Sequence, residues 1–324
     1  MCVFRCLNLG ESRYSPNLLF VLHPATLPVS KRTRLVSLFG SYIALTKPRI
    51  IELLLITTVP TMVVAEKGLP SAWLVTATLI GGTLAAGGAN AINMFVDRDI
   101  DAIMERTKNR PLVTGAVDPI HALIFAISLE VAAFAALWAW VNFLSAVLAV
   151  SATLFYVFIY TLWLKRSSTR NIVIGGAAGA VPVLVGWSAV QNSLDWAPLV
   201  LFGIIFYWTP PHFWALAVKY KDDYAAASVP MLPAVVSLRK TAIRMLGYTL
   251  FLWMLTLIFA PVAEMGWLYV GAAMVLGAIF TWYAIRLLKN PTPAIAMSMF
   301  TYSITYISLL FGAMALDQIL RSGT

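Results

Sequence analysis

The chain has 324 residues, of which 60% are hydrophobic and only 11% are charged. Ordinary soluble domains are roughly 45 to 50% apolar and about 25% charged, so this composition excludes a water-soluble globular protein. The formal net charge is +9, from 23 Lys and Arg against 14 Asp and Glu. The placement of those cations decides whether they indicate a nucleic-acid partner or an orientation in a membrane.

Apolar runs of about 20 residues recur along the chain, and each is long enough to cross a bilayer core of about 30 Å as a helix. Because the runs are uniformly apolar and do not alternate, they predict helices and exclude barrel strands. We therefore expect an all-α polytopic membrane protein with about nine transmembrane helices in one bundle. The predicted spans are about 41–65, 71–93, 119–140, 143–164, 172–190, 197–218, 243–263, 266–288 and 296–316.

The first 38 residues are less apolar, and we expect them to form a disordered N-terminal tail before a single transmembrane domain over 39–324. Both cysteines of the chain, Cys2 and Cys6, lie in this tail, so neither a disulfide framework nor a cysteine metal site is expected. An organellar transit peptide or an overextended start is the alternative interpretation of this acid-poor leader.

The loops alternate sharply in basic residues. On one predicted side lie 21 of the 23 Lys and Arg residues, whereas only Lys67 and Arg321 lie on the other. The positive-inside rule then places the N-terminus in the cytoplasm and the C-terminus outside. The positive charge therefore indicates orientation and contact with anionic lipid headgroups, and no nucleic-acid partner is expected. A bacterial source implies the plasma membrane, and an organellar source the inner mitochondrial membrane.

Three polar residues at the end of the second predicted span, Asn93, Asp97 and Asp101, are spaced i, i+4, i+8 and share one helix face. Asp99 points away from that face. Like carboxylates repel each other, so a shared divalent cation is the simplest reason for the stripe. Oxygen ligands without His or Cys suit Mg²⁺, which bridges one or two carboxylates to substrate phosphates.

Further charges follow this stripe and recur after the sixth predicted span, on the same side of the membrane. They are Arg106, Lys108, Arg110, Lys219, Lys221, Asp222 and Asp223. Acids for a metal beside cations for anionic oxygens are typical of a diphosphate site. The alternative is a solvated helix end whose acids pair with neighbouring arginines.

Two motifs in this region resemble the first aspartate-rich region of the UbiA superfamily of intramembrane prenyltransferases. They are Asn93-x-x-x-Asp97-x-x-x-Asp101 and Arg106-Thr107-x-Asn109-Arg110-Pro111. Further segments, at 45–49, 210–214, 220–224 and 230–233, narrow the resemblance to the branch that attaches a farnesyl group to haem. The resemblance runs from about residue 40 to the C-terminus.

The resemblance implies a Mg²⁺-dependent enzyme that joins farnesyl diphosphate to a vinyl group of haem b, giving haem O on the route to haem A. The catalytic residues that it implies are Asn93, Asp97, Asp101 and Asp223, and the metal ligands are Asp97, Asp101, Asp222 and Asp223. The residues implied to neutralise the diphosphate are Arg106, Lys108, Arg110, Lys219 and Lys221. Lys219 replaces an aspartate common in the superfamily, which leaves the choice between Asp222 and Asp223 open.

His212 lies in the sixth predicted span directly after Pro210 and Pro211. A lone histidine on an apolar span is most often a hydrogen-bonded structural residue. Imidazole also ligates haem iron well, so we hypothesise that His212 binds and orients the porphyrin.

Glu130 lies near the middle of the third predicted span, where an ionisable residue is by default a functional hypothesis. A protonated packing residue is an equally good interpretation. Tyr156 and Tyr160, together with other aromatic residues of the spans, are candidates to line a prenyl pocket or to shield a carbocation.

Two other functions fit parts of the pattern. One is a UbiA-type polyprenyltransferase that acts on an aromatic quinone precursor. The other is a secondary transporter, whose site is expected at the midplane on broken helices, whereas most acids here lie at one end of the spans. The expected partners are the two substrates and the lipid bilayer, with haem-modifying or oxidase-assembly proteins as candidate protein partners.

Overall fold

A computed structural model describes residues 31–323 of the chain, without the side chains of 31–37, 49–50 and 52–55. Residues 1–30 and 324 lie outside the described residues, as do Cys2, Cys6 and most of the predicted tail. The first helix, α1 (Lys31–Thr46), begins within the range predicted as tail. The described part of the chain is helical and contains no strand.

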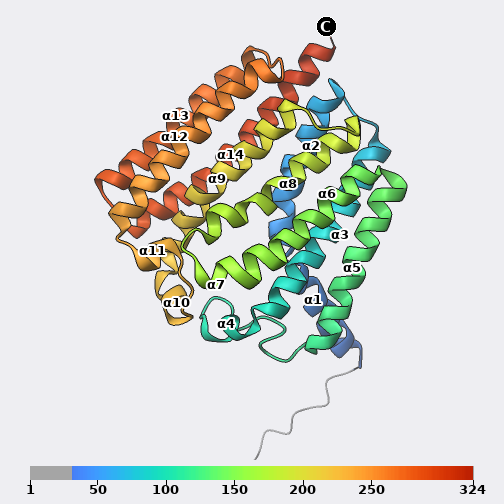
Figure 1. Cartoon of the computed structure of the whole chain (residues 1–324), viewed down its shortest axis with the longest axis vertical. Coiled ribbons are helices and arrows are strands. Elements are labelled where there is room, and N and C mark those ends of the chain that lie inside the picture. Colours follow the sequence, from blue (N-terminus) through green and yellow to red (C-terminus); the bar gives the residue numbers. More distant parts are fainter. Residues whose placement is uncertain (1–30, 324) are drawn as a thin grey trace, which may run out of the picture.

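The helices form one bundle (Figure 1). The long ones are α2 (Pro48–Glu66), α3 (Ala72–Val96), α5 (Pro119–Trp140), α8 (Asn171–Gln191), α9 (Trp196–Lys219), α12 (Leu238–Val262), α13 (Trp267–Lys289) and α14 (Pro293–Ser322). The others are α4 (Arg98–Ile103), α6 (Phe143–Leu154), the π-helix η1 (Phe155–Leu164), α7 (Lys165–Ser167), α10 (Lys221–Ala226) and α11 (Leu232–Val235).

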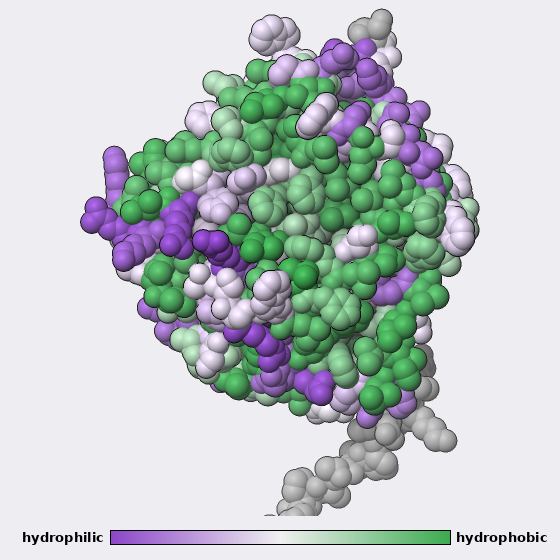
Figure 2. All heavy atoms as spheres, in the orientation of Figure 1, coloured by the Kyte–Doolittle hydropathy of each residue, from purple (hydrophilic) through white to green (hydrophobic). Residues whose placement is uncertain are grey.

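Eight helical segments of the described chain are long and apolar enough to cross a membrane, and one of them is the continuous run 143–167 through α6, η1 and α7. The 19-residue helix α2 corresponds to the remaining predicted span. The predicted all-α, multi-span fold is therefore confirmed. The face shown in Figure 2 agrees with it, because apolar side chains cover most of that surface and hydrophilic ones gather near its edges.

The start of the first predicted span, 41–65, is wrong. Residues 41–46 belong to α1, and the chain turns at Lys47, whose φ of 52° lies in the left-handed region, before Pro48 begins α2. Proline is favoured in the first turn of a helix and disfavours helical geometry in the residue before it. The turn places Lys47 beside Asn93, near the end of α3. We call the end of the bundle where α4, α7 and α10 lie the charged end (Figure 1).

Gly88 allows α3 and α5 to approach each other closely. A Cβ at this position would lie 2.6 Å from Glu130 Oε1 and 3.0 Å from the carbonyl oxygen of Ala126. Glu130 Oε1 also accepts a hydrogen bond of 3.1 Å from Thr153 Oγ1 of α6. Glu130 therefore lies where α3, α5 and α6 meet, in contact with a polar partner.

We expect Gly88→Ala to lower the free energy of unfolding by about 1 to 3 kcal/mol, because the added methyl group overpacks the contact between α3 and α5. Gly82→Ala on the same helix is the matched control, since no atom lies within 4 Å of a Cβ there. Thermal unfolding of both variants in one detergent checks the prediction. Equal melting temperatures would contradict the close contact.

Candidate active site

Asp97 lies at the break between α3 and α4, and its side chain is fully buried. Asn93, one turn earlier, donates from Nδ2 to Asp97 Oδ2 at 2.7 Å. Lys165 of α7 donates to the same carboxylate oxygen. The other oxygen, Oδ1, lies 3.6 Å from Arg166 Nη2 and has no hydrogen-bond partner in the described part of the chain. A buried carboxylate oxygen is thus left with an unused lone pair.

Asp101 is 2% exposed and pairs with Arg110, whose Nη1 lies 2.5 Å from Asp101 Oδ2. Thr107 Oγ1 donates to the Asp101 carbonyl oxygen at 3.0 Å, so the loop after α4 folds back over the acidic stripe. Asp99 is exposed and pairs with Arg166 at 2.7 Å, which lowers the Asp99 pKa to about 2. The stripe therefore has the predicted buried and exposed sides, although the helix breaks at Asp97.

Lys47 reaches the stripe from the turn between α1 and α2. Its Nζ donates to Asn93 Oδ1 at 2.8 Å. Burial, together with the nearby charges of Arg110 and Lys165, lowers the pKa of Lys47 to about 7. Three basic side chains from distant segments, Lys47, Arg110 and Lys165, therefore gather around the buried carboxylates Asp97 and Asp101. We call these five residues the charged cluster, and its excess of basic groups suits an anionic ligand.

The segment after α9 meets the loop after α4 at Arg106. The Arg106 backbone nitrogen donates to Asp223 Oδ2 at 3.2 Å, and its guanidinium lies 5.5 Å from the centre of the Tyr220 ring. Asp223 is half-buried, whereas Asp222 is exposed. This contact favours Asp223 over Asp222 as the acid that belongs to the site.

Three residues predicted to bind the diphosphate are exposed and make other contacts. Lys108 pairs with Glu105 at 2.5 Å, and Lys219 lies 5.5 Å from the centre of the Tyr220 ring. Lys221 is exposed on α10. Among the described residues no ion pair joins these lysines to Asp97 or Asp101.

His212 is also separate from the charged cluster. Its buried ring stacks on Trp208 of α9, with centroids 4.2 Å apart, and on Phe300 of α14, with centroids 4.7 Å apart. Its Nδ1 lies 2.7 Å from Ser303 Oγ. The ring is thus held in the contact between α9 and α14.

Four residues of the site were missed as site residues by sequence reasoning: Lys47, Thr161, Lys165 and Arg166. The basic ones belong to the positive charge of the predicted cytoplasmic side, and Lys47 also lies in the 45–49 segment of the family resemblance, but neither feature assigns them to the site. Thr161 belongs to the π-helix, where its Oγ1 donates to the Tyr156 carbonyl oxygen at 2.9 Å and lies 3.1 Å from Asn93 Nδ2. An apolar run does not reveal such a local widening of the helix.

The π-helix also places two aromatic rings close to the charged cluster. Tyr156 and Tyr160 stack with their centroids 5.3 Å apart and their planes 16° apart. The Tyr160 ring fills the space beside Gly175 of α8, because a Cβ at Gly175 would lie 2.2 Å from it. The pair forms an aromatic surface on η1, one to two turns from Lys165.

The acids of the site do not form a complete set of ligands for a magnesium ion. In the described part of the chain, no three His, Cys, Asp or Glu side chains lie close enough together to hold a metal. The four predicted ligands, Asp97, Asp101, Asp222 and Asp223, therefore do not form a preassembled cage. Mg²⁺ needs only one or two carboxylates when substrate phosphates and water complete its shell. The buried, unpartnered Oδ1 of Asp97 fits that mode of binding.

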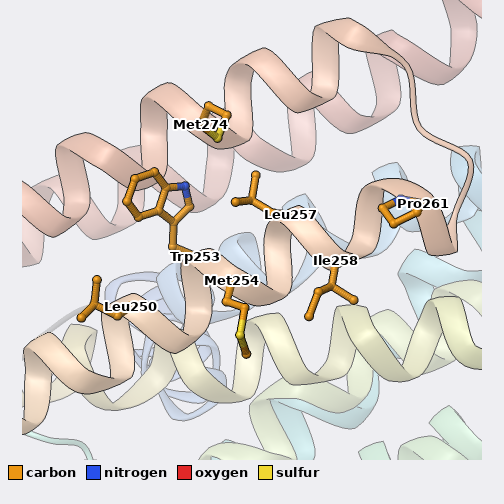
Figure 3. Close-up of a pocket in the computed structure, with 7 residues that line it drawn as sticks. All are labelled: Leu250, Trp253, Met254, Leu257, Ile258, Pro261 and Met274. Atoms are coloured by element: carbon orange, nitrogen blue, oxygen red, sulfur yellow. The ribbon is translucent and has the colours of Figure 1, made fainter.

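A separate hollow of about 540 Å³ lies on the surface of α12 and α13 (Figure 3). Its walls are entirely apolar side chains: Leu250, Trp253, Met254, Leu257, Ile258, Pro261 and Met274. It contains no group that binds a metal or a diphosphate, so the chemistry is assigned to the charged end.

Comparison with known proteins agrees with this geometry. A protein from Streptomyces coelicolor named protoheme IX farnesyltransferase is 49% identical over 87% of this chain and 91% of its own length. A protein of the same name from Frankia casuarinae is 52% identical over 86% and 97% of the two chains.

Two solved structures share the fold. One, of digeranylgeranylglyceryl phosphate synthase, has a TM-score of 0.72 and 16% identity, over 87% of this chain and 99% of that one. The other, a UbiA homolog from Archaeoglobus fulgidus bound to GPP and Mg²⁺, has a TM-score of 0.60 and 17% identity, over 86% and 99%. The model of the UbiA prenyltransferase family matches residues 54–311. The chain therefore belongs to the UbiA prenyltransferase family.

Proposed function

We propose that this chain transfers the farnesyl group of farnesyl diphosphate to a vinyl group of haem b and so makes haem O. The observation that carries the proposal is the charged cluster, which gathers three basic side chains around two buried carboxylates at one end of a membrane bundle. The relatives named protoheme IX farnesyltransferase, about half identical over most of the chain, support the choice of acceptor and prenyl donor.

The basic members of the cluster bind the diphosphate. Lys47, Lys165 and Arg110 come from three different segments and face one small region, so they can neutralise several phosphate oxygens at once. Asp97 and Asp101, with Asn93 and Asp223 nearby, would hold Mg²⁺, which when bound would supply Lewis-acid stabilisation of the charge on the leaving group. The Mg²⁺ bound by the Archaeoglobus fulgidus homolog supports this assignment.

The reaction has two stages: the diphosphate leaves, and the haem vinyl group then captures the farnesyl cation. The allylic C–O bond of farnesyl diphosphate breaks, and the diphosphate leaves with the electron pair. The haem vinyl group captures the farnesyl cation, and water then adds to the resulting cation and loses a proton, which completes a hydroxyethylfarnesyl side chain. The stacked rings of Tyr156 and Tyr160 stabilise the allylic cation by cation–π attraction.

The orientation follows from the distribution of charge. With 21 of 23 basic residues assigned to one side, the charged end faces the cytoplasm. The similarity to bacterial proteins supports a place in the plasma membrane. The farnesyl chain of the product is apolar and keeps the product in the bilayer. The candidate protein partner is therefore a membrane enzyme or assembly factor that receives farnesylated haem.

The acceptor is tested by offering the purified chain farnesyl diphosphate and Mg²⁺ with either haem b or 4-hydroxybenzoate, a representative aromatic quinone precursor. We expect a farnesylated haem in the mass spectrum and no prenylated benzoate. Prenylation of the benzoate alone would assign the chain to quinone-precursor chemistry instead. Uptake of a substrate into vesicles without any prenylated product would favour a transporter.

The two neighbouring acids of α10 are expected to differ in function. Asp223→Asn weakens the contact with the Arg106 backbone and removes a carboxylate that would help to hold Mg²⁺ for the diphosphate, so the KM for farnesyl diphosphate should rise about 10-fold or more. Asp222→Asn is the matched control, because Asp222 is exposed, and its KM should stay near that of the wild type. Steady-state kinetics with varied farnesyl diphosphate concentration measure the KM of both variants. A larger effect at Asp222 would reverse the assignment.

A further inference from the structure

The His212 ring is held on three sides by α9 and α14. Trp208 and Phe300 lie on its two faces, with interplanar angles of 19° and 29°. Ser303 lies at the Nδ1 edge, 2.7 Å away, and the Trp208 indole nitrogen donates to the Ser303 carbonyl oxygen at 2.9 Å. The ring therefore has little freedom to tilt or to rotate.

The hydrogen bonds of Ser303 determine which nitrogen of His212 carries the proton. Ser303 Oγ lies 2.6 Å from the Phe300 carbonyl oxygen, which can only accept a hydrogen bond. A serine hydroxyl has one proton, so this bond uses it. Ser303 Oγ can then only accept from His212, and Nδ1 must be the protonated nitrogen. The other nitrogen, Nε2, has an unprotonated lone pair.

That lone pair is not used inside the protein. In the described part of the chain Nε2 forms no hydrogen bond. It is also not one of the unpartnered polar atoms that are fully shielded from solvent. Neutral imidazole with the proton fixed on one nitrogen is the form that ligates a metal, and the partner of the N–H sets the orientation of the ring. Histidines that ligate a metal have this arrangement, with one nitrogen donating to a fixed partner and the other left free.

We propose that Ser303 is a positioning residue that holds His212 in the tautomer whose Nε2 binds the iron of the porphyrin substrate. This inference rests on the proposed function, in which haem b is the acceptor. Ser303 does not touch the substrate and acts only through His212. The hydrogen bond of His212 to α14 is then part of substrate recognition as well as a link between two helices.

The test is a haem titration of the full-length chain in lipid nanodiscs, followed by the Soret band. We expect the wild type to give the spectrum of histidine-ligated haem and His212→Ala to lose it. Ser303→Ala should weaken haem binding about 10- to 100-fold and shift the Soret band, as loss of an outer-shell partner does at other metal-ligating histidines. Ser303→Thr keeps the hydroxyl and should restore both.

Ser298→Ala is the matched control, because Ser298 is exposed on the same helix and bonds only to the Ala294 carbonyl oxygen. It should bind haem like the wild type. An unchanged spectrum in Ser303→Ala or in His212→Ala would overturn the inference. Equal loss in Ser303→Ala and Ser303→Thr would also overturn it, since packing alone would then explain the effect.

Farnesyl transfer measured on the same samples separates the two proposals. A wild type that makes farnesylated haem, with Ser303→Ala unchanged in its KM for haem, contradicts the function of Ser303 and leaves the proposed function standing. A wild type that shows the His212-dependent spectrum but makes no product contradicts the proposed function and supports the assignment of Ser303.

Discussion

Asp97→Asn is expected to reduce the rate of farnesyl transfer at least about 100-fold, the loss typical of removing one group that stabilises developing charge. The amide keeps the shape of the side chain but removes the negative charge that faces Lys165 and the oxygen available to a metal. The rate of farnesylated haem formation, measured by mass spectrometry in nanodiscs at saturating substrate, checks the prediction.

Asp99→Asn is the matched control for that experiment. Asp99 lies two residues further along the chain, is exposed and pairs with Arg166 at the surface. Its replacement should leave most of the activity, because an exposed ion pair contributes little. If Asp97→Asn and Asp99→Asn lost activity equally, the buried stripe would not be the reactive part of this segment.

Lys165→Met is expected to have the second large effect, on both stability and binding. Removal of one partner of a buried ion pair costs about 3 to 5 kcal/mol, because the other charge is left uncompensated. We expect the lower end of that range, since Arg166 remains 3.6 Å from Asp97 Oδ1. The KM for farnesyl diphosphate should rise about 10-fold or more, as expected for the loss of a charge-assisted hydrogen bond.

The double variant Asp97→Asn/Lys165→Met separates these two effects. It removes both charges, so most of the lost stability should return, while farnesyl transfer should stay as low as in Asp97→Asn. Chemical unfolding of the four proteins in the same detergent gives the coupling free energy. A Lys165→Met protein with the stability and the KM of the wild type would show that the pair does not matter.

The acidic stripe and the membrane spans could be predicted because both depend on local spacing. Apolar runs of about 20 residues predict helices wherever they occur, and i, i+4, i+8 spacing puts Asn93, Asp97 and Asp101 on one side even across a break in the helix. The same spacing correctly separates Asp99 from the stripe.

The basic residues that contact the stripe come from distant parts of the chain, so the spacing of neighbouring residues does not reveal them. Lys47 is 46 residues from Asn93 in sequence, and Lys165 is 68 residues from Asp97. The sequence does not distinguish among the lysines of the charged end, and in the described part of the chain Lys108, Lys219 and Lys221 form no ion pair with Asp97 or Asp101. The turn at Lys47 and the π-helix at 155–164 decide which basic groups face inward.

The partners of His212 could not be predicted from local sequence patterns either. The sequence placed it on an apolar span after two prolines, but the residues that hold it, Phe300 and Ser303, lie on α14 about 90 residues later. The hydrogen bond and the packing of the ring agree with the structural interpretation of His212, whereas the binding of the porphyrin stays a prediction. Whether Nε2 can bind a metal depends on the tautomer of His212, which the hydrogen bond to Ser303 determines.

If the charged cluster transfers a farnesyl group to haem b, the product is a heavier haem. The most direct measurement is the mass of the haem recovered after the purified wild-type chain is incubated with haem b, farnesyl diphosphate and Mg²⁺. We predict a haem with an added farnesyl group and water from the wild type, and at most about 1% of that product from Asp97→Asn. A wild-type sample that returns only unmodified haem b, or equal product from the two proteins, would contradict the account.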